Sequence, residues 1–261
     1  MTLTIEKIRT TNPIILNVAN MVTPQHVADA INFIGGSPIM FTDPREAGDL
    51  TGISNALVLN LGSTNPEAFK SVISSGREAN KKGIPVVVDP VAIGASKIRA
   101  TNFKLLSESV KIDAIRGNIS EIAHIADVAW ASKGIDAGQD SGDKIAIAKT
   151  AATKTGAFII ISGEQDIVTD GHSVFIIQNG NPQFATNVGA GDMLDGIIGV
   201  ALATEFNLAS CAFGTALLSV AGEIAAQEYP NQPYSFFNAV FDTLAQLDDT
   251  TFQKYAKIIQ A

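Results

Sequence analysis

The sequence has little sulfur and few basic residues. Its 261 residues include one cysteine, Cys211, so a disulfide framework within one chain is excluded. A lone cysteine in an apolar stretch is typical of a buried, unreactive thiol. Lys and Arg total 18 against 26 Asp and Glu, which gives a formal net charge of −8. Because binding to nucleic-acid phosphates needs clustered Lys and Arg, this balance argues against nucleic acid as a main partner.

Long hydrophobic runs are equally scarce. The start of the chain, MTLTIEKIRTTN, has no apolar core of the kind found in signal peptides. No stretch of about 18 uncharged apolar residues suggests a membrane-spanning helix. We therefore expect a cytoplasmic protein without a membrane partner. Hydrophobic residues still make up 46% of the chain, which is enough to bury a sizeable core.

Short runs rich in β-branched residues recur through the first two thirds of the chain. They lie at 13–18, 56–61, 84–89, 113–117, 157–162 and 173–178. The early runs are continuous rather than alternating, which is typical of strands covered on both faces of a parallel sheet. Helical stretches at 66–83 and 141–156 lie between such runs. This alternation predicts repeated β–α–β units and an α/β layered fold.

The C-terminal part of the chain has a different pattern. From Gly189 onward the sequence predicts successive helices and no strand. The expected helices cover about 191–204, 207–228, 235–247 and 250–259. No internal repeat, low-complexity tract or break in composition separates this part from the rest. Residues 1–261 are therefore expected to form a single domain.

The segment NVGAGDMLDG (187–196) places glycines and an acidic residue at the start of a predicted helix. A helix N-terminus offers unpaired N–H groups and a partial positive charge, and glycine lets a phosphate approach the backbone. Gly189, Ala190 and Gly191 therefore fit an anion hole with Asp192 beside it. This arrangement suits phosphoryl transfer to an alcohol, with Asp192 as the catalytic base. The alternative is structural: an acidic first-turn residue and glycines that serve packing.

Polar residues also stand at the ends of successive predicted strands, where the ligand crevice of an α/β sheet lies. They are Asp89 after the run at 84–89, Arg116, Asn118 and Glu121 at and after 113–117, and Ser162 and Gly163 after 157–162. Arg116 is suited to gripping phosphate and Glu121 to helping hold Mg²⁺ through water. The structural alternatives are Asp89 as a cap, Arg116–Glu121 as a surface pair and Ser162–Gly163 as ordinary turn residues.

Six segments together resemble the hydroxyethylthiazole kinases of the ribokinase-like superfamily. In chain order they are NPIILNVAN, GGSPIM, VVVDPVAIGAS, IRGNISEI, SGEQDIVTDG and VGAGDM. The resemblance covers 12–205 and, more loosely, the C-terminal helices. It implies a ribokinase-like α/β fold, with a central, mainly parallel sheet flanked by helices on both faces and a helical C-terminal third.

The same resemblance implies an activity. The family uses ATP and Mg²⁺ to phosphorylate the hydroxyethyl group of 4-methyl-5-(2-hydroxyethyl)thiazole for thiamine diphosphate synthesis by salvage. It also implies a homotrimer with thiazole sites at the subunit interfaces. Many members carry Cys where this chain has Asp192, but the wider superfamily uses an Asp at this position as the catalytic base.

Together, the motifs and the resemblance predict a complete site. The expected residues are Asp192 as base, Met40, Asn20 and Gly189 for the thiazole, Arg116, Ser162, Asn118 and Gly191 for ATP, and Asp89 and Glu121 for the metal. Two segments depart from the family pattern, PQHVADA (24–30) and NQPYSFF (231–237). The first contributes His26, which either faces the substrate or is an ordinary helix-start histidine.

Because the thiazole lies near the first of these segments in the family, other functions stay open. The protein could phosphorylate a different vitamin-precursor alcohol, of the hydroxymethylpyrimidine or pyridoxal type. It could instead be an ATP-dependent dehydratase of hydrated nicotinamide nucleotides, a class that shares the fold. A third alternative is a non-catalytic protein that binds a thiazole or a nucleotide.

Overall fold

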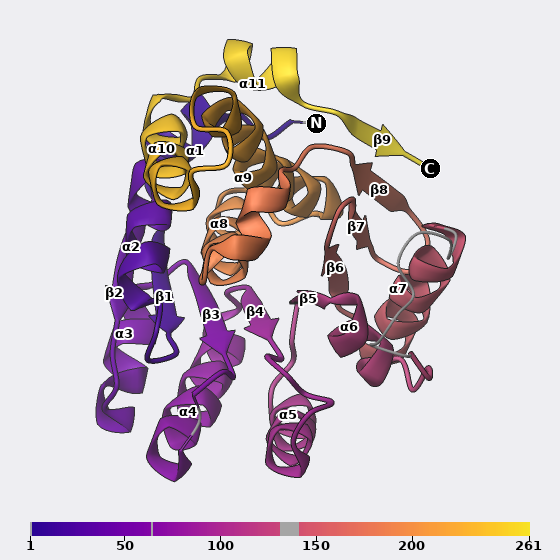
Figure 1. Ribbon diagram of the computed structural model, residues 1–261. Coiled ribbons are helices and arrows are strands. Elements are labelled where there is room, and N and C mark those ends of the chain that lie inside the picture. Colours follow the sequence, from indigo (N-terminus) through magenta and orange to yellow (C-terminus); the bar gives the residue numbers. More distant parts are fainter. Residues whose placement is uncertain (1, 64, 131–140) are drawn as a thin grey trace.

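A computed structural model of the protein describes residues 2–63, 65–130 and 141–261 (Figure 1). In these ranges one nine-stranded sheet has the order β2-β1-β3-β4-β5-β6-β7-β8-β9. The strands are β1 (Ile14–Val18), β2 (Ser37–Met40), β3 (Ala56–Asn60), β4 (Val86–Asp89), β5 (Ala114–Asn118), β6 (Phe158–Ser162), β7 (Asp166–Thr169), β8 (Val174–Ile177) and β9 (Ile258–Gln260). Neighbours from β2 to β6 pair in parallel, and neighbours from β6 to β9 pair antiparallel.

Helices cover both faces of the sheet, and each face has its own core. One face carries α1 (Ile5–Thr11), α2 (Pro24–Phe33), α8 (Ala190–Thr204), α9 (Leu208–Glu228), α10 (Pro233–Gln246) and α11 (Asp249–Tyr255). The other carries α3 (Ala47–Ile53), α4 (Pro66–Lys82), α5 (Lys97–Ser109), α6 (Ile119–Ile125) and α7 (Ser141–Thr155). Successive strand residues alternate between the cores, as Ile15 and Leu16 do, because side chains of a strand point to opposite faces.

Most of the predicted architecture is confirmed. The sheet is mainly parallel and flanked by helices on both faces, and the predicted helices at 66–83 and 141–156 correspond to α4 and α7. The prediction of no strand after Gly189 is wrong. The predicted helix at 250–259 ends at Tyr255, and the three residues of β9 pair with the edge of β8. The conformation of so short a strand depends on this partner, which is distant in sequence, rather than on its own residues.

One helix, α9, is long and apolar enough to cross a membrane by length and composition. It is the only such helix in the ranges described above. Most of its residues are nevertheless buried, and it packs between α8 and α10. A helix that is apolar all round and enclosed by protein is typical of the core of a large domain.

The parallel strands bring their carboxyl ends to one edge of the sheet. β3, β4, β5 and β6 end at Asn60, Asp89, Asn118 and Ser162. Asn60 pairs in register with Asp89, and Asn118 pairs with Ser162. The helix α8 packs against β1, β3 and β4. The polar residues predicted at strand ends are therefore neighbours on one edge, as expected for an α/β sheet.

Candidate active site

The start of α8 depends on the glycine that precedes it. Gly189 is the N-cap residue and has φ = 103°, a left-handed conformation that favours glycine. A Cβ at this position would also lie 2.7 Å from Thr23 Cγ2. The first backbone N–H groups of a helix have no partner within the helix, and Asp192 lies in this first turn. This local geometry is compatible with the predicted anion hole beside Asp192, which stays a prediction.

Three donors surround the carboxylate of Asp192. Asn20 Nδ2 donates to Asp192 Oδ2 at 2.9 Å, and Asn60 Nδ2 donates to Oδ1 at 2.9 Å. The hydroxyl of Thr23 donates to Oδ2 as well. Asn20 has a fixed orientation, because its Oδ1 accepts the N–H groups of Val22 and Thr23 at 2.7 and 3.0 Å. These three hydrogen bonds fix the position of the Asp192 carboxylate beside the start of α8.

A buried ion-pair network lies beneath Asp192. Arg116 Nε donates to Asp195 Oδ1, and Arg116 Nη2 donates to Asp195 Oδ2 and to Asp89 Oδ2, each at 2.7 Å. The side chains of Arg116, Asp89 and Asp195 are 7%, 3% and 1% exposed. The alternative of Arg116 and Glu121 as a surface pair is therefore wrong. Asp89 is not a helix cap either, because it ends β4 and binds Arg116.

Burial and mutual repulsion shape the titration of this network. Burial raises the pKa of Asp195 to about 6, against the opposing effect of Arg116. Burial also holds the pKa of Asp89 well above its ordinary value. Although burial disfavours the charged guanidinium, the carboxylates of Asp195 and Asp89 raise the pKa of Arg116 above its ordinary value. Arg116 therefore stays charged at the centre of the acidic network.

The network has features that suit a divalent cation. One carboxylate oxygen from each of Asp89, Asp192 and Asp195 lies within 4.8 Å of the other two. Arg116 is the cation that binds the carboxylates of Asp89 and Asp195. Asp89 Oδ1 is buried and has no hydrogen-bond partner among the residues that the structure describes. Carboxylate oxygens are the ligands that Mg²⁺ prefers in proteins. The predicted metal role of Asp89 fits this donor set.

The predicted residues Glu121 and Asn118 are occupied by the start of α6. Glu121 Oε1 accepts the N–H of Ala92 at 2.7 Å, and Oε2 accepts the N–H of Asn118 at 2.8 Å. Asn118 Oδ1 in turn accepts the N–H of Glu121 at 3.0 Å, which completes a capping box. Glu121 therefore ties the loop after β4 to β5, and the predicted role in holding Mg²⁺ through water stays a prediction.

Ser162 ends β6 beside Asn118, one strand away from Arg116. Its hydroxyl lies 3.4 Å from the carbonyl oxygen of Gly117. The next residue, Gly163, donates its N–H to buried Asp166 Oδ1 at 2.9 Å. Ser162 thus ends β6 and Gly163 begins the bend that leads to β7, at the edge of the sheet where ATP is expected, and the ATP contact of Ser162 stays a prediction.

The residues expected to contact the thiazole come from three elements. Asn20 follows β1, Gly189 caps α8, and half-buried Met40 ends the edge strand β2 in register with Asn17. His26 lies in the first turn of α2, and its Nδ1 would be 3.3 Å from a Cβ at Gly189, so whether it faces the substrate stays open. Its ring meets the ring of Phe237 edge-on at 5.1 Å.

Three site residues escaped the sequence analysis: Asn60, Thr23 and Asp195. Asn60 is the next-to-last residue of the predicted strand at 56–61 and the last residue of β3, so the strand-end argument that found Asp89 also applies to it. Asp195 follows Asp192 by three residues, which places both on one helix face, and it is a lone charge in an apolar run. Thr23 gives no such signal, because only the packing of α2 against α8 brings it to the site.

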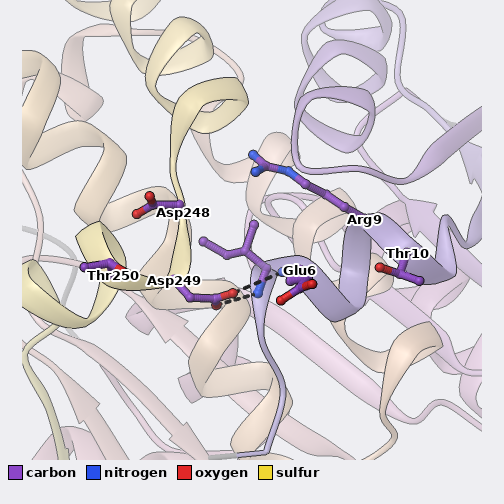
Figure 2. Close-up of a pocket in the computed structure, with 7 residues that line it drawn as sticks. Glu6, Arg9, Thr10, Asp248, Asp249 and Thr250 are labelled. Carbon is purple, nitrogen blue, oxygen red and sulfur yellow. Dashed lines mark hydrogen bonds between the residues drawn. The ribbon is translucent and has the colours of Figure 1, made fainter.

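A separate pocket lies between α1 and the start of α11 (Figure 2). Its polar groups already serve the fold. Asp249 carboxylate oxygens accept the N–H groups of Ile5 and Glu6 at 2.7 and 3.2 Å. Arg9 donates to the carbonyl oxygen of Ala245 at 2.8 Å. This pocket joins α1 to the C-terminal helices and contains none of the candidate site residues.

The fold and the acidic helix-start site define a ribokinase-like protein. The solved hydroxyethylthiazole kinase from Pyrococcus horikoshii superposes with a TM-score of 0.89 at 25% identity, covering 98% of this chain and 97% of that one. The pyridoxal kinase from Staphylococcus aureus in complex with ADP shares the fold, with a TM-score of 0.61 at 14% identity over 80% of this chain and 87% of that one.

The hydroxyethylthiazole kinase family matches residues 5–250. A hydroxyethylthiazole kinase from Lactococcus lactis is 42% identical over 243 residues, which is 93% of this chain and 96% of the relative. The chain belongs to the hydroxyethylthiazole kinase family, and the resemblance found in the sequence is confirmed.

Proposed function

We propose that the protein phosphorylates the hydroxyethyl group of 4-methyl-5-(2-hydroxyethyl)thiazole with ATP, in the cytoplasm, for thiamine diphosphate salvage. The observation that carries this proposal is the placement of Asp192. Its carboxylate accepts hydrogen bonds from Asn20 and Asn60 in the first turn of α8, beside unpaired backbone N–H groups. An alcohol and a phosphate can therefore meet between a proton acceptor and an anion hole.

In this mechanism Asp192 accepts the hydroxyl proton as the bond to phosphorus forms. The pKa of an alcohol is far above that of a carboxylic acid, so the proton moves late, together with phosphoryl transfer. Backbone N–H groups at Gly189–Gly191 stabilise charge on the transferred group. Ser162 and Asn118 hold the nucleotide at the neighbouring strand ends. Positioning supplies most of the rate enhancement.

We assign the metal-facing role to Asp89, with Glu121 acting through water. The orphaned Asp89 Oδ1 and the excess of carboxylates over guanidinium support this assignment. Mg²⁺ held there would neutralise the charge that develops on the phosphates during transfer. Arg116 keeps Asp89 in place through its Nη2.

We further propose that the active form is a homotrimer in which a second copy covers the thiazole site. The support is apolar surface beside the substrate residues. Met21 and Val22, which follow Asn20, are 82% and 70% exposed, and Val188, which precedes Gly189, is 71% exposed. Apolar side chains grouped at a site in this way favour a protein–protein contact over solvent.

The decisive experiment is mass spectrometry of the products after incubation with ATP, Mg²⁺ and a panel of alcohols. We expect the thiazole alcohol to gain a phosphate. If a hydroxymethylpyrimidine or pyridoxal-type alcohol gains the phosphate instead, the assigned substrate would be wrong but the proposed kinase mechanism would stand. ATP hydrolysis coupled to dehydration of a hydrated nicotinamide nucleotide would replace the reaction class. Binding without turnover would identify a non-catalytic protein.

A further inference from the structure

Asp195 is an unusual residue for its surroundings. It lies one turn beyond Asp192 on α8 and is the only charged residue in the buried run from Met193 to Leu202. Its side chain is 1% exposed. A buried charge is costly unless it is paired and hydrogen-bonded, so its partner indicates its role.

Both carboxylate oxygens of Asp195 bind one guanidinium. Oδ1 accepts from Arg116 Nε and Oδ2 accepts from Arg116 Nη2, each at 2.7 Å. Two parallel hydrogen bonds of this kind fix the plane of a guanidinium as well as its position. Asp89 contacts only Nη2, which alone would leave the guanidinium free to rotate about that contact.

The fork leaves the third nitrogen, Arg116 Nη1, outside both hydrogen bonds to Asp195. A Cβ at Gly191 would lie 2.7 Å from Nη1, 2.9 Å from Nη2 and 3.0 Å from Cζ, so the guanidinium packs against this glycine with Nη1 nearest. Gly191 belongs to the first turn of α8, where the phosphate is expected. Asp195, Arg116 and Gly191 thus form a chain of contacts that leads from the core to the anion hole.

We propose that Asp195 is a positioning residue, which holds Arg116 by its Nε–Nη2 edge and so keeps Nη1 aimed at the phosphate site beside Gly191. This inference rests on the proposed kinase function. Asp195 does not contact the substrate itself, because the guanidinium occupies both of its oxygens. Its effect on nucleotide binding must therefore pass through Arg116.

The test compares wild type with Asp195→Asn. An amide keeps one acceptor and turns an N–H₂ group toward the guanidinium, so the fork is broken. We expect the KM for ATP and the dissociation constant of Mg–ADP, measured by calorimetry, each to rise about 10-fold. We also expect kcat to fall about 10-fold, because a displaced Arg116 no longer contacts the phosphate in the right position. The KM for the thiazole alcohol should stay within about twofold, because Asp195 acts on the phosphate side.

Asp113→Asn is the matched control. Asp113 is also a buried carboxylate of the sheet layer, 9% exposed, but it accepts from Val86 N and Lys111 at the opposite ends of the strands. We expect its kinetics to match wild type. If Asp195→Asn does not fold, Asp195→Ser enters the same assays, because it removes the fork without turning an N–H₂ group toward the guanidinium.

A double-mutant cycle with Arg116→Lys distinguishes a positioning role of Asp195 from a general structural role. Lys cannot form the fork, so adding Asp195→Asn to Arg116→Lys should change Mg–ADP binding by less than about twofold. Additive effects would overturn the proposal, as would unchanged nucleotide binding in both Asp195 variants. A raised Mg²⁺ requirement with normal nucleotide affinity would also overturn it, in favour of direct metal contact. Absence of Mg–ADP binding in the wild type would instead refute the proposed kinase function.

Discussion

Asn60 Nδ2 donates to Asp192 Oδ1 at 2.9 Å and so ties the end of β3 to the first turn of α8. The same amide nitrogen lies 3.2 Å from Asp89 Oδ2. One neutral donor therefore bridges the carboxylate assigned as base and the carboxylate assigned to the metal. Because like charges so close repel each other, this bridge stabilises the relative placement of the two acids.

Asn60→Ala should lower kcat by about 10–100-fold, because Asp192 loses a donor and moves relative to Asp89. Mg–ADP binding should change less than kcat does, because Asp89 keeps its hydrogen bond from Arg116 Nη2. The measurement is steady-state kinetics together with calorimetry of Mg–ADP. Asn55→Ala is the control: Asn55 lies just before the opposite end of β3, where its Oδ1 accepts the N–H of Ile14 at 2.8 Å. Equal losses in both variants would show that Asn60 only supports the strand.

Asp192→Asn should lower kcat by about 10²–10⁴-fold, because the proton acceptor is lost while the shape is kept. The new amide also faces the donors Asn20 and Asn60, which should lower the free energy of unfolding by about 1–3 kcal/mol. Quenched-flow or coupled kinetics gives the first effect and urea denaturation the second. Turnover near that of wild type would remove Asp192 from the role of base.

Sequence reasoning found the strand ends of the site but not the contacts between them. Asp89, Arg116 and Ser162 could be located because a short apolar run fixes where a parallel strand ends. The partner of Arg116 could not be read from the same pattern. Asp195 lies 79 positions away along the chain, and only the packing of α8 on the sheet brings the two together. Such pairing is a tertiary property.

The strands that escaped prediction are short or lie at an edge of the sheet. β2 and β9 are the two edge strands, and β7 has four residues between two turns. A strand of this length carries too few side chains to show a period, so its partner decides its conformation. The long helices α8, α9 and α10 match their predicted ranges to within two residues at each end, because many apolar positions define them.

Gly191→Ala should impair both the site and the fold. The added Cβ would lie 2.7 and 2.9 Å from Arg116 Nη1 and Nη2, and Asp89 and Asp195 hold that guanidinium in place. We expect the free energy of unfolding to fall by about 1–3 kcal/mol, as for other overpacked sites. Mg–ADP affinity should fall as well. Calorimetry and urea denaturation measure the two effects.

Gly52→Ala is the matched control for that substitution. Gly52 lies in α3, and a Cβ there would meet no atom within 4 Å. Alanine is favoured over glycine in a helix by about 0.5–1 kcal/mol, so this variant should be neutral or slightly more stable. Similar destabilisation by both alanines would contradict the steric argument for Gly191.

Asp166 should make stability depend on pH in the weakly acidic range. Burial raises its pKa to about 6, above the ordinary value of 3.8, while hydrogen bonds from Gly163 and Ser219 oppose the rise. The folded state thus binds this proton more tightly than the unfolded state does. The resulting stabilisation is present at low pH and is lost as pH rises through about 6.

The free energy of unfolding of wild type minus that of Asp166→Asn should therefore fall by about 1 kcal/mol between pH 5 and pH 8. Urea denaturation of both proteins at the two pH values measures it. In the control residue Asp170, burial opposes ionisation, but the N–H groups of His172 and Ser173 lower the pKa. The difference in the free energy of unfolding between wild type and Asp170→Asn should accordingly stay constant over this range. A constant difference for Asp166→Asn too would contradict the raised pKa.

Met21→Lys should separate the subunits of the proposed homotrimer. Met21 is 82% exposed and follows Asn20, so a charge here would be buried, unpaired, at an interface that covers the thiazole site. We expect light scattering after size exclusion to show the mass falling from three chains to one. The KM for the thiazole alcohol should rise about 10-fold or more, while Mg–ADP affinity stays near that of wild type. Ile98→Lys is the control, because Ile98 is 68% exposed on α5, away from the substrate residues, and should leave mass and KM unchanged. A wild-type protein that is monomeric and fully active would refute the trimer, because the thiazole site would then be complete within one chain.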